Sequence, residues 1–215
     1  MNEKLSTRFI TRQYMLSQDF ELYYYSDAQM TQVPVHAHDY YEFYFFLEGD
    51  VEMHIGSAVY PLRHGNVIVI PPDTRHQAVQ RQVPAGAGAP PYRRFVLWLS
   101  RDYLQHLEQL SRDYTYLLQK GLPGYVYRWN DLVFNSLQAK IFSLLEEIHA
   151  DRFGREARVS LGIADLLLTL NRTVYEQEHA SVQQAQGTDL YDSAIRYIET
   201  HIHEPLTLDI LADRL

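Results

Sequence analysis

The stretch HAHDYYEFYFFLEG, residues 36–49, sets two histidines and a glutamate at fixed offsets within a run of aromatic residues. Residues two apart in an extended chain point to the same face. If this stretch is a strand, His36, His38, Tyr40 and Glu42 share one side of it. The stretch therefore predicts a β-rich fold in which several polar side chains converge.

His76 follows the turn-forming segment PPDTR and is expected to complete this group from a neighbouring strand. Three imidazoles and one carboxylate suit iron, manganese, zinc or nickel. The same side chains can instead pair with one another or form the polar wall of an organic-ligand pocket. Both interpretations stay open on the sequence.

Short strand-like runs separated by turn residues extend over residues 20–99. Residues 51–62, VEMHIGSAVYPL, alternate apolar and polar residues around Gly56-Ser57, which predicts a hairpin with a two-residue turn. The run VIVI at 67–70 is apolar on both faces, which predicts a strand buried on both sides. Many short strands at this spacing indicate a small barrel or jelly roll.

After Ser100, a suitable helix N-cap, the apolar spacing becomes helical. Helices are predicted over about residues 101–120, 131–153 and 156–177, the second with an Asn130 or Asp131 cap. The fold class is therefore α+β, a barrel followed by a helical region.

The third predicted helix contains IADLLLTL, residues 163–170, which is apolar around nearly its whole circumference. Such a helix is buried on more than one side. We expect the additional face to form the interface of a homodimer, and the alternative is a helix that packs only on its own barrel.

Composition limits the function. The chain has 215 residues, a formal net charge of −8 and no cysteine. The negative charge argues against a DNA-binding surface on this part of the protein, and any metal must be held by His, Asp or Glu. No apolar run reaches membrane-spanning length and no secretory signal is recognisable, so we expect a cytoplasmic protein without membrane contact.

The opening stretch resembles the first cupin motif, H-x-H-x3-E-x6-G, at His36, His38, Glu42 and Gly49. The resemblance implies a cupin barrel. In cupin enzymes the corresponding side chains, together with the histidine of the second motif, bind a metal ion.

The second cupin motif, G-x5-P-x-G-x2-H-x3-N, is matched at Gly65, Pro71 and His76. Two positions depart from it, because Asp73 stands where the family has glycine and Gln80 where it has asparagine. The resemblance therefore implies a metal site of His36, His38, Glu42 and His76, but many sensor cupins keep part of this pattern without a functional metal.

Residues 189–215 resemble the start of the DNA-binding domain of AraC-type transcription regulators. There a helix ending in E-P-L-T-L leads into the first helix of a helix-turn-helix, for which Thr207 is the expected cap. The resemblance implies a barrel over 1–100, a helical dimerisation region over 101–179, a linker over 180–188 and an incomplete helix-turn-helix domain. We expect DNA contact only through a complete C-terminal domain, since the second helix of the motif reads DNA.

The leading hypothesis is an effector-sensing and dimerisation region of an AraC-type regulator. Its effector is a small molecule, with a sugar suggested by the tyrosine-rich strands. The rival hypothesis is a metal-dependent cupin enzyme, either a dioxygenase or an isomerase. The expected ligand-binding residues are His36, His38, Tyr40, Glu42, Tyr44, Arg75, His76 and Trp98.

Overall fold

The computed structural model describes residues 5–81, 90–119 and 125–184, together with Tyr197, Thr207 and Ile210. The chain divides into two compact units, Met1–Asn171 and Arg172–Leu215, and each is described by itself. The strands are β1 (Phe20–Asp27), β2 (Tyr41–Glu48), β3 (Val51–Ile55), β4 (Ala58–Pro61), β5 (Asn66–Ile70), β6 (His76–Gln80), β7 (Tyr92–Leu99) and β8 (Val126–Arg128).

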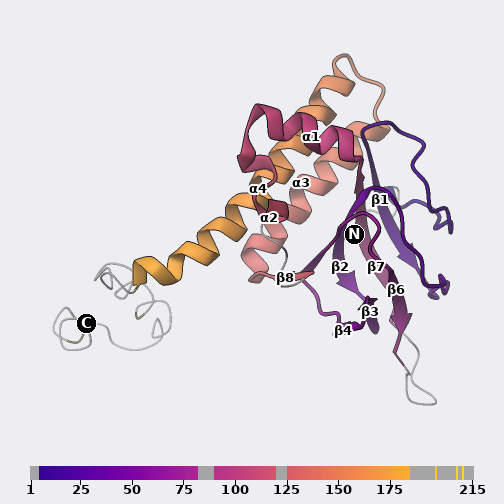
Figure 1. The fold of residues 1–215 in the computed structure, drawn as a ribbon, viewed down its shortest axis with the longest axis horizontal. Coiled ribbons are helices and arrows are strands. Elements are labelled where there is room, and N and C mark those ends of the chain that lie inside the picture. Colours follow the sequence, from indigo (N-terminus) through magenta and orange to yellow (C-terminus); the bar gives the residue numbers. More distant parts are fainter. Residues whose placement is uncertain are drawn as a thin grey trace. The chain divides into compact units, whose positions relative to one another are not determined.

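The strands form two antiparallel sheets. The larger has the order β1-β7-β2-β5-β8 and the smaller the order β4-β3-β6. Apolar side chains of both sheets meet in one core cluster, which includes Tyr44 and Ile68 from the larger sheet and Met53 and Ile55 from the smaller. This barrel and the helices that follow it confirm the predicted α+β fold (Figure 1).

The two predicted strand features are confirmed. Ile55 pairs with Ala58 across the Gly56-Ser57 turn, and Gly56 has a φ of 58°, a conformation that glycine adopts without steric cost. All five residues of β5 are buried. That strand lies between β2 and β8, and its Ile68 and Ile70 belong to the barrel core.

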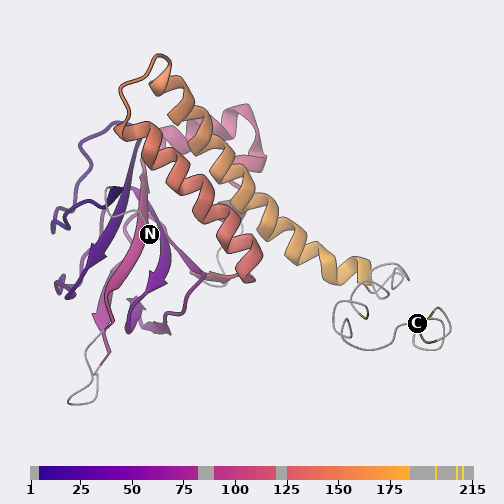
Figure 2. The same ribbon diagram turned by 180° about the vertical axis from the view of Figure 1, so that it is seen from behind.

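The larger sheet is covered on both faces. On its inner face Tyr44, Val96 and Trp98 belong to the barrel core. On its outer face the ring centroid of Phe142, a residue of the helical region, lies 5.0 Å from that of Phe95, and Leu97 on the same face is fully buried. Figures 1 and 2 show helices α1 and α3 against this outer side. Coverage of both faces explains the continuous apolar runs at residues 43–47 of β2 and 95–99 of β7.

The helices are α1 (Arg101–Leu110), a 3₁₀ turn (Arg112–Tyr114), α2 (Tyr116–Gln119), α3 (Asp131–His149) and α4 (Arg155–Gln184). The predicted caps are confirmed, since Ser100 accepts a hydrogen bond from the Tyr103 N–H and Asn130 accepts one from the Val133 N–H. The single helix predicted over 101–120 is wrong. It is interrupted at Ser111, whose side chain caps the 3₁₀ turn instead.

Two element positions differ from the predicted layout. Strand β8 follows the first helices and pairs with β5, so the barrel sheet takes a strand from beyond residue 100. Helix α4 continues to Gln184, so the first residues of the predicted linker 180–188 are helical. Strand β8 joins the barrel sheet because its pairing partner β5 lies far away in the sequence.

The apolar run in α4 is buried mainly within its own chain. Ile163, Leu166 and Leu167 are fully buried, and Gly162 lets α4 approach Leu144 of α3 closely. The homodimer interface remains a prediction.

The predicted helix-turn-helix region, residues 189–215, lies largely outside the described residues. Within it, the Thr207 hydroxyl accepts a hydrogen bond from the Ile210 N–H at 3.3 Å, as expected of a helix N-cap. Among the helices of the described residues, none combines the length and apolar character that crossing a membrane requires.

Candidate functional site

The register of the larger sheet places Glu42 at the centre of the candidate site. Glu42 pairs with Ile70 of β5 on one side and with Trp98 of β7 on the other. The Trp98 Nε1–H donates to Glu42 Oε1 at 3.3 Å. The carboxylate is thus held on the inner face of the barrel, and only 8% of the residue is exposed.

His36 and His38 belong to a segment that is not a strand. β2 begins at Tyr41, and the chain bends at Asp39 and Tyr40, so the expectation that the whole stretch is extended is wrong for its first residues. Instead, His36 forms an isolated backbone bridge with His76, with N–O distances of 3.1 and 2.9 Å. Pairing with the β6 edge therefore replaces continuation of β2.

Glu42 contacts two of the imidazoles. Its Oε2 lies 3.1 Å from Nε2 of His38 and 3.1 Å from Nε2 of His76. Burial would raise the pKa of Glu42, but these hydrogen bonds outweigh burial and lower it. Burial would lower the pKa of His76, but its hydrogen bond to Glu42 raises it. The carboxylate is therefore ionised and attracts positive charge between itself and the rings.

His36 stands at the rim of the group. Its ring centroid lies 4.2 Å from that of His76, and the residue is half-buried. Burial lowers the pKa of His36. One ligand nitrogen from each of His36, His38 and His76 lies within 4.8 Å of the others.

The imidazole orientations fit a metal ion. Every Nδ1 lies 2.9 Å from a backbone carbonyl, which only accepts hydrogen bonds, so Nδ1 carries the hydrogen and Nε2 of a neutral ring offers a lone pair. The carbonyls belong to Pro34 for His36, Tyr40 for His38 and Thr74 for His76.

The spacing of the ligand atoms fits as well. Two atoms that each lie about 2.1 Å from a metal are roughly 3.0–3.4 Å apart in octahedral or tetrahedral geometry. The 3.1 Å separations between Glu42 and the two imidazoles fall in this range. Without a cation, a carboxylate would face two nitrogen lone pairs unless both rings were protonated. The three imidazoles, two of which contact Glu42, can therefore hold one divalent transition metal.

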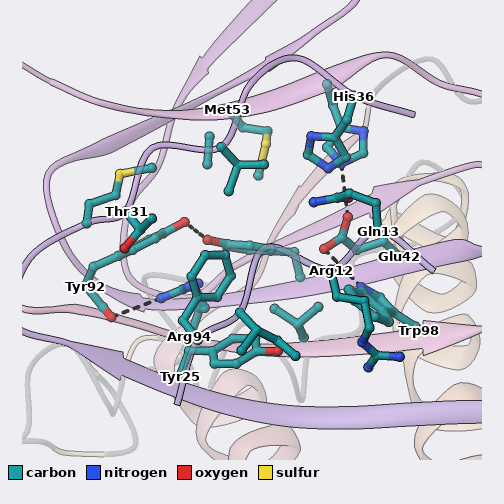
Figure 3. Close-up of a pocket in the computed structure, with 18 residues that line it drawn as sticks. Arg12, Gln13, Tyr25, Thr31, His36, Glu42, Met53, Tyr92, Arg94 and Trp98 are labelled. Carbon is teal, nitrogen blue, oxygen red and sulfur yellow. Dashed lines mark hydrogen bonds and ion pairs between the residues drawn. The ribbon is translucent and has the colours of Figure 1, made fainter. Parts of the chain in front are cut away.

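A cavity of about 70 Å³ adjoins this group inside the barrel. A cavity of this volume has room for on the order of five water molecules. Figure 3 shows His36 and Glu42 at one end of it and Tyr92 and Arg94 at the other. Apolar side chains such as Met53 lie between them, so the pocket has two polar ends and an apolar middle.

Five of the eight predicted ligand-binding residues line the cavity: His36, Glu42, Tyr44, His76 and Trp98. The other three, His38, Tyr40 and Arg75, do not line it. The ring of Tyr40 stacks on that of His38 with a centroid distance of 3.8 Å, which positions the imidazole from behind. Arg75 is exposed at the surface.

Sequence reasoning missed the N-terminal segment. Arg12 lines the cavity, lies over the Trp98 ring and forms an ion pair with Glu21 at 2.5 Å. Phe9 also lines the cavity and packs edge-on against Tyr25. No motif marks these residues, since their place depends on how the segment lies across the barrel.

Arg94 and Tyr92 were also missed, although the sequence carries a signal for them. Tyr92, Arg94, Val96 and Trp98 follow one another at two-residue spacing along β7, so all four lie on the same face. That face is the inner one, because all four residues line the cavity. A buried arginine on the inner face of a barrel strand requires partners, and the structure supplies them.

Comparison with known proteins supports the fold. The family model described as "Cupin domain" matches residues 27–83, the region that carries the histidines and Glu42. No curated protein matches the sequence.

Solved structures with a similar fold include a cupin 2 conserved barrel domain protein from Salinispora arenicola, with 19% identity, coverage of 50% of this chain and 92% of that chain, and a TM-score of 0.36. Apo ToxT K231A from Vibrio cholerae has 10% identity, coverage of 92% of this chain and 70% of that chain, and a TM-score of 0.47. The lyase DddQ, which acts on DMSP, from Ruegeria pomeroyi has 23% identity, coverage of 40% of both chains and a TM-score of 0.33.

Proposed function

We propose that this chain is the effector-sensing and dimerisation region of an AraC-type transcription regulator. A small molecule enters the cavity inside the cupin barrel and controls DNA binding by a C-terminal domain. The AraC-type assignment rests on the resemblance of residues 189–215, to which the Thr207 cap contributes. A sugar effector remains a prediction from the tyrosine-rich strands.

One observation carries the proposal: the strands that line the cavity also support the helices. Along β7, Val96 and Trp98 line the cavity, while the alternate residue Phe95 packs on Phe142 of α3. On β1, Tyr25 lines the cavity and Tyr24 contacts the same Phe142 ring. A ligand that favours one position of these strands therefore favours one position of α3, which is all that linkage between two sites requires.

The effector response of the intact regulator tests this proposal. It is measured as expression of a reporter gene placed under a promoter that the regulator controls. Glu42→Gln and Tyr44→Phe change polar atoms in the cavity with little change of shape, and both should reduce the response. Phe153→Ala, at a fully exposed residue, is the control and should respond normally. A normal response in both cavity variants would refute the pocket assignment.

A metal-dependent cupin enzyme is the second candidate, and the three imidazoles around Glu42 favour it. Cupin domains occur in both enzymes and regulators. His36, His38, Glu42 and His76 would hold the ion, which would supply a Lewis acid or activate oxygen. The chain's own residues would orient the substrate in the cavity and exclude water from it.

Metal content separates these possibilities. The protein, purified without a histidine tag, should be analysed by elemental analysis beside the His36→Ala/His76→Ala double variant. One metal per chain that is lost in the variant would establish a metal site, and absence of metal would leave the polar wall of an effector pocket. Steady turnover of a small substrate, abolished by His76→Ala, would favour the enzyme over the regulator.

A further inference from the structure

The end of the cavity opposite the histidines presents hydrogen-bond donors. Arg94 lines it and is only 3% exposed. Its Nη1 donates to Asp27 Oδ2 at 2.6 Å and to the Tyr92 carbonyl at 3.3 Å. Within the described residues these are the hydrogen bonds of the guanidinium, so Nε and Nη2 are left for a ligand.

Aromatic rings hold this guanidinium in place. Its carbon lies 3.9 Å from the Tyr92 ring centroid and 4.8 Å from the centroids of both Tyr25 and Phe9. Tyr25 is the direct cross-strand partner of Arg94. Rings on the faces of a guanidinium leave only its N–H edge for hydrogen bonding, and that edge is therefore preorganised.

Two tyrosine hydroxyls add a further donor. The hydroxyls of Tyr44 and Tyr92 are hydrogen-bonded to each other, and both residues line the cavity. In such a pair one O–H donates to the other oxygen, and the accepting hydroxyl keeps its own hydrogen for another partner. Among the described residues, the second hydroxyl hydrogen of the pair has no acceptor. It can therefore donate to a ligand in the cavity.

We propose that the cavity binds a small organic monocarboxylate, with its carboxylate at Arg94 and the Tyr44–Tyr92 pair and its apolar body toward Met53. The carboxylate is an acceptor-only group whose geometry matches the guanidinium edge. The cavity volume of about 70 Å³ restricts the acid to a short chain. This inference rests on the proposed function and names the chemical class of its effector.

The sugar prediction and this inference make different demands on the pocket. A neutral sugar has many hydroxyl donors and requires acceptors from the protein. At the Arg94 end, the groups without a protein partner among the described residues are the guanidinium N–H groups and one tyrosine hydroxyl, all of which are donors. The carboxylate of Asp27, an acceptor, is already paired with Arg94. A ligand end that consists of acceptors satisfies them better.

Isothermal titration calorimetry with paired ligands tests the inference. Sodium propanoate and sodium butanoate are compared with propanamide and butanamide, which keep the shape and lose the charge. The acids should bind about tenfold more tightly than the amides, in line with the greater strength of hydrogen bonds to charged groups. Equal binding of acid and amide would overturn the inference.

Variants locate the bound acid. The double variant Tyr44→Phe/Tyr92→Phe should weaken acid binding about tenfold and amide binding less, because hydrogen bonds to a neutral acceptor are weaker than those to a carboxylate. Tyr103→Phe is the matched control, because Tyr103 is buried on α1 and does not line the cavity, and this variant should bind normally. Melting temperatures check that the variants are folded.

Three other outcomes count against the inference. Acid binding that survives the tyrosine double variant but is lost in His36→Ala/His76→Ala would place the carboxylate at the histidines. Neutral sugars that bind while the acids do not would overturn the inference and leave the proposed sensor intact. Failure of acids, amides and sugars alike would remove support for the proposed function as well.

Discussion

The two faces of the five-stranded sheet come from the same strands but differ in chemistry. The outer face is apolar: Phe43, Phe95 and Leu97 are fully buried beneath helices or neighbouring side chains. The inner face carries Glu42 and Arg94, both buried and both paired. The outer face therefore contributes mainly stability, whereas the inner face gives up some stability to hold buried charged groups in place.

The largest effect is expected on the outer face. Phe95→Ala removes a ring that packs on Tyr24 and Phe142 and leaves a cavity in the core. We expect a loss of about 4 kcal/mol in the free energy of unfolding, measured by urea denaturation. The matched control is Phe153→Ala, which should change it by less than about 0.5 kcal/mol. Equal losses in the two variants would contradict the assignment of the outer face.

A smaller, pH-dependent effect is expected on the inner face at Glu21. Burial would raise the pKa of Glu21, but hydrogen bonds from Arg12, Tyr23 and two backbone N–H groups lower it overall. Glu21→Gln leaves Arg12 buried without its counter-charge and should cost about 3 kcal/mol at pH 7.

The sign of the pH dependence follows from the lowered pKa. A carboxyl group whose pKa is lower in the folded state stabilises the protein above its unfolded pKa of about 4.3. That contribution is lost as the pH falls through the folded value, so the difference between wild type and Glu21→Gln should shrink in acid. Denaturation at pH 7 and below pH 4 measures it, and a difference that does not change with pH would be inconsistent with the ion pair.

The helical layer should respond next. A Cβ atom at residue 162 would lie 2.5 Å from Leu144 Cδ2. Gly162→Ala should therefore destabilise the protein by about 2 kcal/mol through overpacking, although alanine is the better helix former. Leu161→Ala, at the exposed neighbouring residue, should be nearly neutral. Stabilisation by Gly162→Ala would show that α3 and α4 are not in close contact there.

The smallest effect is expected where strand β8 leads into α3. Asn130 caps this helix through a 2.9 Å hydrogen bond from the Val133 N–H. Asn130→Ala should cost about 1 kcal/mol, and Asn130→Asp, which keeps the acceptor, should cost much less. Comparable losses in both variants, measured by thermal unfolding, would show that the side-chain cap is not what stabilises α3.

The fold was predictable where local patterns and long-range packing agree. The hairpin at Gly56, the doubly buried β5 and the caps at Ser100 and Asn130 all follow from residue type and spacing. The break at Ser111 did not follow from them, and neither did the pairing of the predicted β-like segment YVYRW, the site of β8, with β5, because partners distant in the sequence decide that pairing.

The candidate site was predictable in part for the same reason. Motif spacing found the three histidines and Glu42, which the structure brings together. It did not find Arg12, whose place depends on how the N-terminal segment crosses the barrel. It named Arg75 and not Arg94, although Arg94 shares a face of β7 with Trp98 by two-residue spacing.

Hydrogen–deuterium exchange measured by mass spectrometry tests the central claim, that a ligand on the inner face acts on helices packed on the outer face. The chain is compared with and without the compound that most raises its melting temperature in a small-molecule screen. The account predicts slower exchange in β2 and β7 and a changed rate in α3, where Phe142 contacts the strands. Protection confined to residues outside the barrel, or a protected barrel with α3 unchanged, would contradict it.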